Sequence, residues 1–329
     1  MSEPVGEWTG MWRHEDFRLE EPIGKGGMAV VHRAVHLPSA GTYAIKIVSP
    51  RTAADLHHID REIQLSVRVR SPHVMRTYGS EKVGTDVWIV MEHFLGHKLK
   101  SVLRNHLSAR HRFPFFSFQR YVDHFRSIAD GLQAIHRCGI VHCDVKPENV
   151  MLSEDGYRLL DLGIACEIHS PPGEVAGTPT YMAPEQIRNE PLDARTDLYS
   201  LGVTMLEAAV GVPPFVPPSL QKIADGLNQP GLDAAHRWDL LGKYLQVRIA
   251  DLQTSRLGID LQQAHTESLF EQHLKAKPRL PATFPYAPEV GKVLLKCLEK
   301  DPRLRWTNAG ELIQRLEELC ESHPSNQRW

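Results

Sequence analysis

The chain has 329 residues, of which 42% are hydrophobic and 24% charged, a composition typical of a globular protein with a substantial core. The formal net charge of -2 argues against bulk attraction to nucleic acid or to anionic membranes. No segment approaches the roughly 20 uninterrupted apolar residues of a membrane span, and the N-terminus lacks the pattern of a secretory signal. The five cysteines are scattered without metal-ligand spacing, so we expect a reducing, cytoplasmic setting.

The N-terminal part of the chain predicts two strands around a glycine-rich turn. Residues 1–16 are polar and contain two tryptophans, so we expect them to form a lead-in segment. The alternation of apolar residues that begins at Phe17 indicates a strand, a turn and a second strand. Gly24, Gly26 and Gly27 in the turn would let backbone N–H groups approach a phosphate. By themselves these glycines favour a plain hairpin turn, and a phosphate-binding role requires further motifs downstream in the chain.

A lysine and a glutamate in the next two predicted elements are expected to form an ion pair. The segment 42–48 reads as a strand in which Lys46 lies among apolar neighbours, so this lysine either reaches the surface or has an anionic partner. Glu62, in the next predicted element, is the expected partner; the alternative is an exposed side chain on a helix surface. That element is predicted to be a helix because four apolar residues recur at three- and four-residue spacing: Leu56, Ile59, Ile63 and Val67.

The middle of the chain predicts a connection followed by a long helix. A β-rich run at 87–94 ends in a connector suited to joining two lobes. The basic, histidine-rich segment 98–118 is expected to be a solvated helix and loop rather than a binding patch. A helix over 119–137, ended by Gly139, is indicated by a stripe of apolar side chains: Tyr121, Phe125, Ile128, Leu132 and Ile135.

The loop at 140–152 is the feature most suggestive of catalysis. Apolar triplets flank a polar core that holds Asp144, Lys146 and Asn149. Pro147 can neither continue a helix nor donate to a strand ladder, so this core is expected to be rigid and to aim the acid and the amide the same way. A capped turn between two strands is the alternative. The sharper interpretation is a phosphoryl-transfer loop, in which the acid orients a hydroxyl, the lysine meets a phosphate and the amide holds a divalent metal.

Downstream of this loop the sequence predicts a second metal-binding side chain and a buried helix. Segment 157–165 reads as an apolar strand that ends in a triplet containing Asp161. Because Mg²⁺ prefers oxygen ligands, Asp161 can meet a metal held by Asn149; the alternative is an Asx turn after a strand. The segment 195–211 is nearly all apolar and ends in glycine, so its helix is expected to lie in the core of a helical lobe.

The order of these parts resembles that of the eukaryotic-type (Hanks-type) Ser/Thr protein kinases, and the wording GKGGMAVV, DLGIA and GTPTYMAPEQ looks most like their bacterial branch. The resemblance covers about residues 17–322. It implies an α+β, bilobal kinase fold, with a β-rich N-lobe carrying one key helix at 17–92, a larger and mainly helical C-lobe at 93–322, and a tail at 323–329. The match rests on independent pieces in the family's order: Gly24 to Val31, Lys46, Glu62, His142 to Asn149, Asp161 to Gly163, Ala183 to Glu185, Asp197 and Arg305.

The resemblance implies ATP and Mg²⁺ as cofactors, with Mn²⁺ as a substitute, and assigns roles residue by residue. Asp144 would accept or orient the proton of the substrate hydroxyl, and Lys146 would neutralise the transferring phosphoryl group. Asn149 and Asp161 would hold the metal. The residues implied in binding ATP, directly or through the lysine, are Ile23, Gly24, Lys25, Gly26, Gly27, Val31, Ala44, Lys46, Glu62, Met91, Glu92, Phe94 and Met151.

Within this set the resemblance separates the hinge from the walls of the adenine pocket. Met91 would gate the back of the pocket, and the backbone from Glu92 to Phe94 would be the hinge that hydrogen-bonds adenine. The side chains expected to sandwich the adenine ring are Val31, Ala44 and Met151.

The resemblance also implies scaffolding residues and partners. Glu185 should pair with Arg305 and tie the substrate-docking segment to the helical lobe, while Asp197 should support the backbone of the catalytic loop. Thr307 is the expected N-cap of the last helix. The implied partners are protein substrates and a cognate phosphatase, with no nucleic acid.

Three positions depart from the family pattern. Ala29 replaces the third glycine of the loop with the smallest side chain available, and Leu162 replaces a phenylalanine while keeping an apolar plug. Cys143 stands where the family usually has an arginine that clamps a phosphorylated threonine. The stretch 164–176 contains Ser170 but no threonine. We therefore hypothesise that activity does not depend on phosphorylation of this activation segment.

Two features leave alternatives open. Cys143 and Cys166 both lie near the implied active site, so oxidation could regulate it, although two inert buried thiols are the interpretation that the residues favour. Relative to the family, residues at about 217–266 are inserted and displace the next helix to 268–280. Apolar residues at helical spacing within 234–247 predict that the insertion folds onto the lobe. It serves either as a surface for docking or self-association, or as a private structural elaboration.

The leading hypothesis is a Ser/Thr protein kinase, because Lys146 and Thr178 resemble the Ser/Thr-directed version of the family. A catalytically weak scaffold of the same fold is the main alternative. A small-molecule kinase is a further one, but it would need neither Thr178 nor the partner Arg305. A scaffold predicts damage in at least one of four positions that are all intact: Lys46, Asp144, Asn149 and Asp161.

Overall fold

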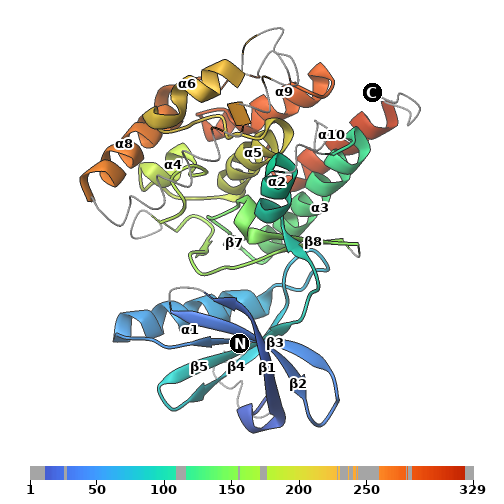
Figure 1. Ribbon diagram of the computed structural model, residues 1–329, viewed down its shortest axis with the longest axis vertical. Helices are drawn as coiled ribbons and strands as arrows, with labels where there is room; N and C mark the ends of the chain where they lie inside the picture. The colour runs from blue at the N-terminus through green and yellow to red at the C-terminus, as the bar shows by residue number, and fades with distance from the viewer. Residues whose placement is uncertain are drawn as a thin grey trace.

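The computed structural model describes two lobes joined by a connection that follows strand β5 (Figure 1). One lobe is built on a five-stranded antiparallel sheet and the other is mainly helical, so the predicted α+β, bilobal fold is confirmed. None of the helices in the part of the chain that the structure describes is both long and apolar enough to cross a membrane. The described residues are 12–25, 28–108, 116–154, 156–170, 176–227, 229, 236, 240–241, 243, 259–278, 280 and 284–322.

The sheet of the N-lobe has the strand order β1-β2-β3-β5-β4. One strand was not predicted: β4 has few apolar residues and pairs with β5 alone, so as an edge strand it leaves only a weak alternating pattern. By contrast, β3 occupies the range that the sequence predicted. The five strands are β1 (Phe17–Lys25), β2 (Ala29–His36), β3 (Thr42–Val48), β4 (Thr77–Val83) and β5 (Asp86–Glu92).

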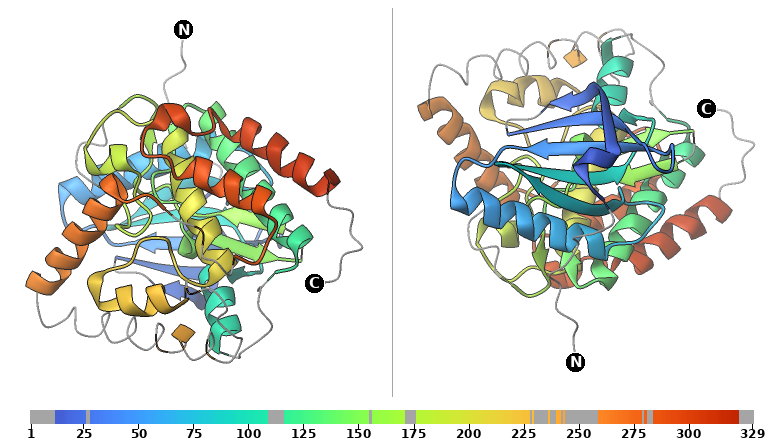
Figure 2. Two further views of the ribbon diagram at one scale, coloured as in Figure 1. Left: turned by 90° about the horizontal axis from the view of Figure 1, so that it is seen from above. Right: turned by 90° about the horizontal axis from the view of Figure 1, so that it is seen from below.

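Helix α1 (Ala53–Arg68) packs along one face of this sheet, as the predicted amphipathic pattern requires (Figure 2). It buries Ile59, Ile63 and Val67 against apolar side chains of β3 and β5. The helix begins at a capping box, in which the Thr52 hydroxyl accepts from the Asp55 backbone N–H at 3.1 Å and the Asp55 carboxylate accepts from the Thr52 N–H. The start of α1 is therefore fixed by local chemistry and its orientation by apolar burial.

The opposite face of the sheet carries an aromatic cluster that includes residues from before β1. The Trp12 ring lies 5.2 Å from the rings of His36 and Tyr43, measured between centroids. His14 donates a hydrogen bond from its backbone N–H to Glu81 of β4. Residues 12–16, expected as part of a lead-in segment, thus pack on the N-lobe. The first eleven residues lie outside the described part of the chain.

The C-lobe is organised around α5, whose residues from Thr196 to Val210 are all buried. This agrees with the nearly uninterrupted apolar sequence, and the helix ends at Gly211, which has a φ of 87° that favours glycine. Among the described residues, the helices of the lobe are α2 (Leu99–Ser108), α3 (Phe118–Arg137), α4 (Pro184–Ile187), α5 (Ala194–Val210), α6 (Pro218–Leu227), α8 (Ile259–Lys275), α9 (Pro288–Cys297) and α10 (Ala309–Ser322).

Three predicted boundaries are wrong. The helix predicted at 268–280 is α8, which begins nine residues earlier in a run of good helix formers and ends before Pro278. The strand predicted at 157–165 is β9 (Gly156–Leu159), because the chain turns away at Asp161, where φ is 63°. The last helix is capped by Asn308 instead of Thr307, since the Asn308 side chain accepts from the Glu311 N–H at 3.0 Å.

The expected insertion at about 217–266 is described only in part. Helix α6 forms its beginning and α8 its end. Most of the helix predicted within 234–247 lies outside the described residues, but Leu241 is fully buried in the core of the C-lobe.

Candidate active site

The polar loop lies between two short strands, as the sequence predicted. Strand β7 (Ile140–Val141) precedes it and β8 (Val150–Ser153) follows it, with a 3-10 turn at Pro147–Asn149. The apolar residues on both sides and within the loop are fully buried: Ile140, Val141, Val145 and Val150. The flanks therefore anchor the loop in the C-lobe core, and the polar side chains between them are held on a rigid backbone.

Asp197 supports this loop from the first turn of α5, confirming its predicted contact with the backbone. Its two carboxylate oxygens accept hydrogen bonds from the backbone N–H groups of His142, at 2.8 Å, and Cys143, at 2.9 Å. The Nε2 atom of His136 lies 2.7 Å from the same carboxylate, a contact that the sequence did not suggest. Because Asp197 is fully buried, these bonds act in a water-excluded environment and fix the entry to the loop.

Four polar side chains converge at the centre of the loop. One carboxylate oxygen of Asp144 accepts from the Thr178 hydroxyl at 2.8 Å, and the other accepts from the Asn149 amide at 2.9 Å and from Lys146 Nζ at 2.6 Å. Lys146 also donates to the Thr178 hydroxyl at 2.5 Å. The structure thus brings together the acid, base and amide predicted from the sequence, and adds Thr178, which lies two residues after the activation segment.

Asp161 is tied to the same loop through the backbone before it. The Leu160 carbonyl lies 2.9 Å from His142 Nε2, and the Leu160 N–H donates to the Asn149 carbonyl at 2.9 Å. The exposed Asp161 side chain accepts from the Gly163 N–H at 3.0 Å, which is the local turn that was weighed as the alternative for this residue. The turn holds one carboxylate oxygen, so it orients Asp161 beside the loop.

The N-lobe contributes the predicted ion pair. Lys46 Nζ lies 2.5 Å from Glu62 Oε1, and the two side chains are 21% and 18% exposed. Burial alone would lower the pKa of Lys46, but the negative charges of Glu62 and Asp161 outweigh burial and raise it. Lys46 is therefore a cation whose electrostatic neighbours come from both lobes.

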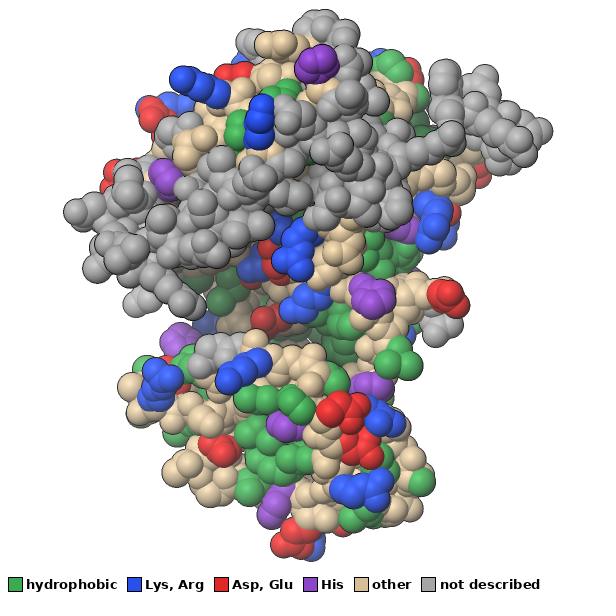
Figure 3. Space-filling model, in the orientation of Figure 1, with side chains coloured by type: hydrophobic (Ala, Val, Ile, Leu, Met, Phe, Trp, Pro, Cys, Tyr) green, Lys and Arg blue, Asp and Glu red, His purple; other side chains and the backbone are tan. Residues whose placement is uncertain are grey.

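The predicted adenine-pocket residues of the N-lobe share the face of the sheet that carries Lys46. Val31 is the register partner of Lys46, and Met91 is the partner of Ala44 two residues away, so all four side chains project to one side. Gly24 is the partner of Val31 across the β1–β2 ladder. The surface between the two lobes is hollowed in the space-filling view (Figure 3).

Other members of the predicted ATP set are placed less completely. Ile23 is half exposed and Lys25 is exposed at the end of β1. Gly26 and Gly27 lie outside the described residues. Met151 belongs to β8, where it pairs with Lys98 just after the connection between the lobes.

An arginine that the sequence analysis missed holds this connection. The Arg158 guanidinium donates to the Glu92 carboxylate at 3.0–3.3 Å and stacks 4.5 Å from the centroid of the Phe94 ring. The Glu92 N–H donates to the Arg76 carbonyl at 2.8 Å. The side chains on both ends of the predicted hinge are therefore fixed by β9. Only the alternation of polar and apolar residues in that four-residue strand could have pointed to Arg158.

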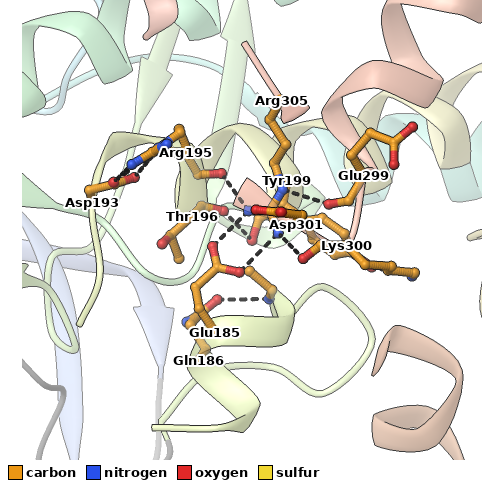
Figure 4. Close-up of polar contacts among 12 residues, drawn as sticks. Glu185, Gln186, Asp193, Arg195, Thr196, Tyr199, Glu299, Lys300, Asp301 and Arg305 are labelled. Atoms are coloured by element: carbon orange, nitrogen blue, oxygen red, sulfur yellow. Dashed lines mark hydrogen bonds and ion pairs between the residues drawn. The ribbon is translucent and has the colours of Figure 1, made fainter. Parts of the chain in front are cut away.

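Glu185 of α4 and Arg305 form the predicted ion pair (Figure 4). The guanidinium binds both carboxylate oxygens, at 2.6 and 2.9 Å. Its remaining N–H groups donate to the backbone carbonyls of Arg195, Glu299 and Lys300. All five donors of the guanidinium are thus used, which satisfies a charge that is removed from water.

The chain has two lobes joined by a hinge. One lobe carries a lysine–glutamate pair and the other a loop that holds an acid and an amide. This arrangement places the chain among the kinase-like folds. The chain belongs to the protein kinase family: the model of the protein kinase domain matches residues 17–320, close to the range inferred from the motifs.

The curated relatives of the chain include serine/threonine-protein kinases and a protein named as like the catalytic subunit of a cAMP-dependent protein kinase. A cAMP-dependent protein kinase, catalytic subunit-like, of Caenorhabditis briggsae is 30% identical over 72% of this chain and 61% of its own length. A probable serine/threonine-protein kinase of Clostridium acetobutylicum is 26% identical over 93% of this chain and 40% of its own length. Serine/threonine-protein kinase cst-1 of Caenorhabditis elegans is 35% identical over 61% of this chain and 40% of its own length. The chain therefore spans about half the length of these relatives.

Proposed function

We propose that this protein is an ATP-dependent Ser/Thr protein kinase that transfers the γ-phosphoryl group to hydroxyls of protein substrates without prior phosphorylation of its activation segment. The observation that carries the proposal is the convergence of Lys146, Asn149 and Thr178 on the Asp144 carboxylate. A scaffold that performs no catalysis has no need to orient this carboxylate with four donor groups, the fourth being the Thr178 N–H. The similarity to a Clostridium kinase over 93% of the chain supports the bacterial branch of the family.

The donor atoms at the site fit Mg²⁺ or Mn²⁺ bound together with ATP. The Asn149 amide nitrogen is used by Asp144, so its oxygen is the atom that would bind a cation, together with the exposed Asp161 carboxylate. The described residues include no cluster of three or more His, Cys, Asp or Glu side chains that could hold a metal. A cation held by two side chains and by phosphate oxygens needs no such cluster.

Asp144 is the group that would accept or orient the proton of the attacking hydroxyl. Because hydrogen bonds reach both of its oxygens, the carboxylate cannot rotate freely and keeps one direction toward the site. Lys146 is held against it at 2.6 Å and places positive charge where phosphoryl oxygens would lie. Bound ATP with its metal supplies the phosphoryl group and additional positive charge. The chain itself supplies orientation and fixed charge.

The N-lobe would bind the nucleotide. Lys46, kept cationic by Glu62 and Asp161, is the expected contact of the phosphates. Since the Glu92 N–H already donates to the Arg76 carbonyl, adenine recognition at that residue falls to the Glu92 carbonyl, with the backbone of Phe94 as the further hinge contact.

At Cys143 the activation segment is docked by neutral contacts, where the family uses an arginine and a phosphate; farther along, Glu167 pairs with Arg68 of α1 at 3.3 Å. Cys143 packs in an apolar cluster with Val141, Cys166 and Leu192. Strand β10 (Cys166–Glu167) pairs with β7, and the Ile168 N–H donates to the Gly139 carbonyl at 2.9 Å. None of these contacts requires a charge at Cys143. They support a segment that adopts its docked position without phosphorylation.

The test is incubation of phosphatase-treated protein with radiolabelled ATP and a generic basic protein. We expect phosphorylation by the wild type and a loss of about 10²-fold or more in Asp144→Asn and Lys46→Ala. Equal background in all three proteins would leave the scaffold as the function. Activity that disappears only after phosphatase treatment would overturn the independence from phosphorylation.

A further inference from the structure

Two thiols from different functional segments touch behind the active site. The Sγ atoms of Cys143, in the catalytic loop, and Cys166, in β10 of the activation segment, lie 3.6 Å apart. The side chains are only 4% and 2% exposed, and both residues are free cysteines. The contact follows from the pairing of Cys166 with Val141, which places the activation segment directly beside the residue two positions before Cys143.

The position of Cys143 is fixed by its surroundings on three sides. Its backbone has a φ of 68°, a left-handed conformation that residues other than glycine, asparagine and aspartate rarely adopt. Its N–H donates to Asp197 at 2.9 Å and its carbonyl accepts from the Gln186 side chain at 2.8 Å. Cys166, by contrast, belongs to a strand of two residues. The thiol in the loop is therefore the rigid partner and the thiol in β10 the more movable one.

The electrostatics of the pair make the two thiols unequal. The hydrogen bond between them lowers the pKa of the Cys166 thiol and raises the pKa of the Cys143 thiol, which is also raised by burial. The cation of Arg61 on α1 further favours ionisation of Cys166. Cys166 lies in the short strand β10, so it is the thiol that an oxidant meets first when β10 opens, and its lowered pKa favours the nucleophilic thiolate.

We propose that Cys143 and Cys166 form an intramolecular disulfide under a peroxide-class oxidant, and that this bond clamps the activation segment onto the catalytic loop. The Cys166 sulfur attacks one peroxide oxygen, the O–O bond breaks, and a sulfenic acid and one water are formed. The Cys143 sulfur then attacks the Cys166 sulfur and releases the second water. Two thiols and one hydrogen peroxide thus give one disulfide and two waters. A thiol reductant reverses the reaction.

The disulfide holds the active arrangement because little movement is needed to form it. The two sulfur atoms must approach from 3.6 Å to about 2.05 Å. Since Cys143 is held by Asp197 and Gln186, the approach is made by Cys166 and draws β10 toward the loop. The Lys46–Glu62 pair is already formed in this arrangement. The bond takes the place of the arginine–phosphate clamp, and in this respect the inference rests on the proposed kinase function.

Access of the oxidant requires a local opening of β10. The ladder between β10 and β7 contains two residue pairs, and short ladders of this kind open at low free-energy cost. Cys138 and Cys320 are partly exposed and serve as internal reporters that peroxide has reached the protein.

The first experiment treats the reduced full-length chain with hydrogen peroxide and maps disulfides by mass spectrometry after proteolysis at acidic pH. We expect a cross-linked peptide pair that contains Cys143 and Cys166 in the wild type and is missing in Cys166→Ser. The control Cys320→Ser should retain it. Oxidation of Cys138 and Cys320 without this cross-link would overturn the proposal.

The second experiment measures the clamp by thermal unfolding and by activity. The bond closes a loop of 23 residue steps, so the melting temperature of the oxidised wild type should rise by on the order of 5 °C and return on reduction; no rise would contradict the clamp. Kinase activity is compared as the ratio of oxidised to reduced protein. Retained activity supports the clamp, and loss of activity in cross-linked protein contradicts it. Inactivity in both states would refute the kinase function, while the cross-link still decides whether the disulfide forms.

Discussion

Glu185 and Arg305 lie 120 residues apart in the chain and form a bidentate ion pair that is closed to solvent, with their side chains 4% and 0% exposed. We expect Arg305→Met to lower the free energy of unfolding by about 3–5 kcal/mol, because it leaves the Glu185 carboxylate buried without its cation. Urea-induced unfolding of the two proteins measures the difference.

Arg303 provides a matched control two residues away. It also forms a bidentate pair, with Asp301, but its side chain is 83% exposed. Arg303→Met should therefore leave the midpoint of unfolding nearly unchanged. If both variants lost the same stability, the burial of the Glu185 pair would not be the cause.

The contacts of Asp197 predict a loss of catalysis that is separate from nucleotide binding. In Asp197→Asn one acceptor oxygen is replaced by an NH₂ group, so the N–H of either His142 or Cys143 faces a donor instead of its acceptor. The catalytic loop should shift, and because misplacement by about 1 Å can cost 10²-fold in rate, we expect kcat to fall by about that factor. The KM for ATP should change little, since the residues proposed to bind the nucleotide lie mainly in the N-lobe. Steady-state kinetics separates the two parameters.

Asp193 serves as the control for this variant. It is the N-cap of α5, four residues before Asp197, and its side chain accepts from the Arg195 N–H. Asn is an equally good N-cap, so Asp193→Asn should keep both kcat and the fold. A comparable fall in kcat in this variant would show that disturbance of α5, and not support of the loop, lowers the rate.

The elements that could be predicted from the sequence are those whose pattern is local and repeated. Helices α1, α3 and α5 have apolar faces or runs of 16 to 20 residues, so periodicity alone indicates their type and place. The Lys46–Glu62 pair could be inferred from a lysine among apolar strand residues and a glutamate beside the apolar face of the next helix. The Glu185–Arg305 pair joins residues 120 positions apart, which no local pattern reveals, and it followed only from motifs that resemble a known family.

The features that escaped prediction depend on contacts between short segments. Strand β4 is an edge strand with few apolar residues, and β10 contains only two residues, which pair with the equally short β7. A two-residue strand shows no alternation, so the approach of Cys166 to Cys143 had no sequence signal beyond the presence of both thiols. The role of Arg158 likewise depends on how β9 faces the hinge.

The Arg158 contacts with the hinge predict a specific effect on nucleotide affinity. Arg158→Met removes both the ion pair with Glu92 and the stacking on Phe94. The hinge then loses its fixed orientation, and we expect the KM for ATP to rise by up to about tenfold, equivalent to roughly one such interaction. The kcat should be preserved, because the residues around Asp144 are untouched. ATP titrations in the kinase assay measure both values.

Arg76→Met is the control for the hinge. Its side chain lies 5.4 Å from the centroid of the Tyr78 ring, and its contacts with Glu92 come from the backbone: its N–H donates to the Glu92 carboxylate at 3.4 Å and its carbonyl accepts from the Glu92 N–H. The substitution keeps that carbonyl, so the KM for ATP should match the wild type. An equal rise in both variants would point to general weakening of the N-lobe.

The buried imidazole of His273 predicts how stability depends on pH. His273 lies in α8 with no exposed surface, and its Nδ1 is 2.9 Å from the Tyr199 hydroxyl. Burial, helped by the nearby cation of Lys300, lowers the pKa of His273 from 6.5 to about 3. The folded protein therefore keeps this ring neutral while the unfolded chain protonates it below pH 6.5.

The sign of the effect follows from proton uptake by the unfolded state. Stability from His273 is fully present above the unfolded pKa and is lost as pH falls from 6.5 toward 3, by up to about 1.4 kcal/mol per pH unit. In His273→Gln this contribution to the slope should vanish, whereas His57→Gln on the exposed surface of α1 should keep it. Urea unfolding at about pH 7 and about pH 5 provides the comparison. Parallel losses of stability in the wild type and His273→Gln would assign the acid sensitivity to other groups.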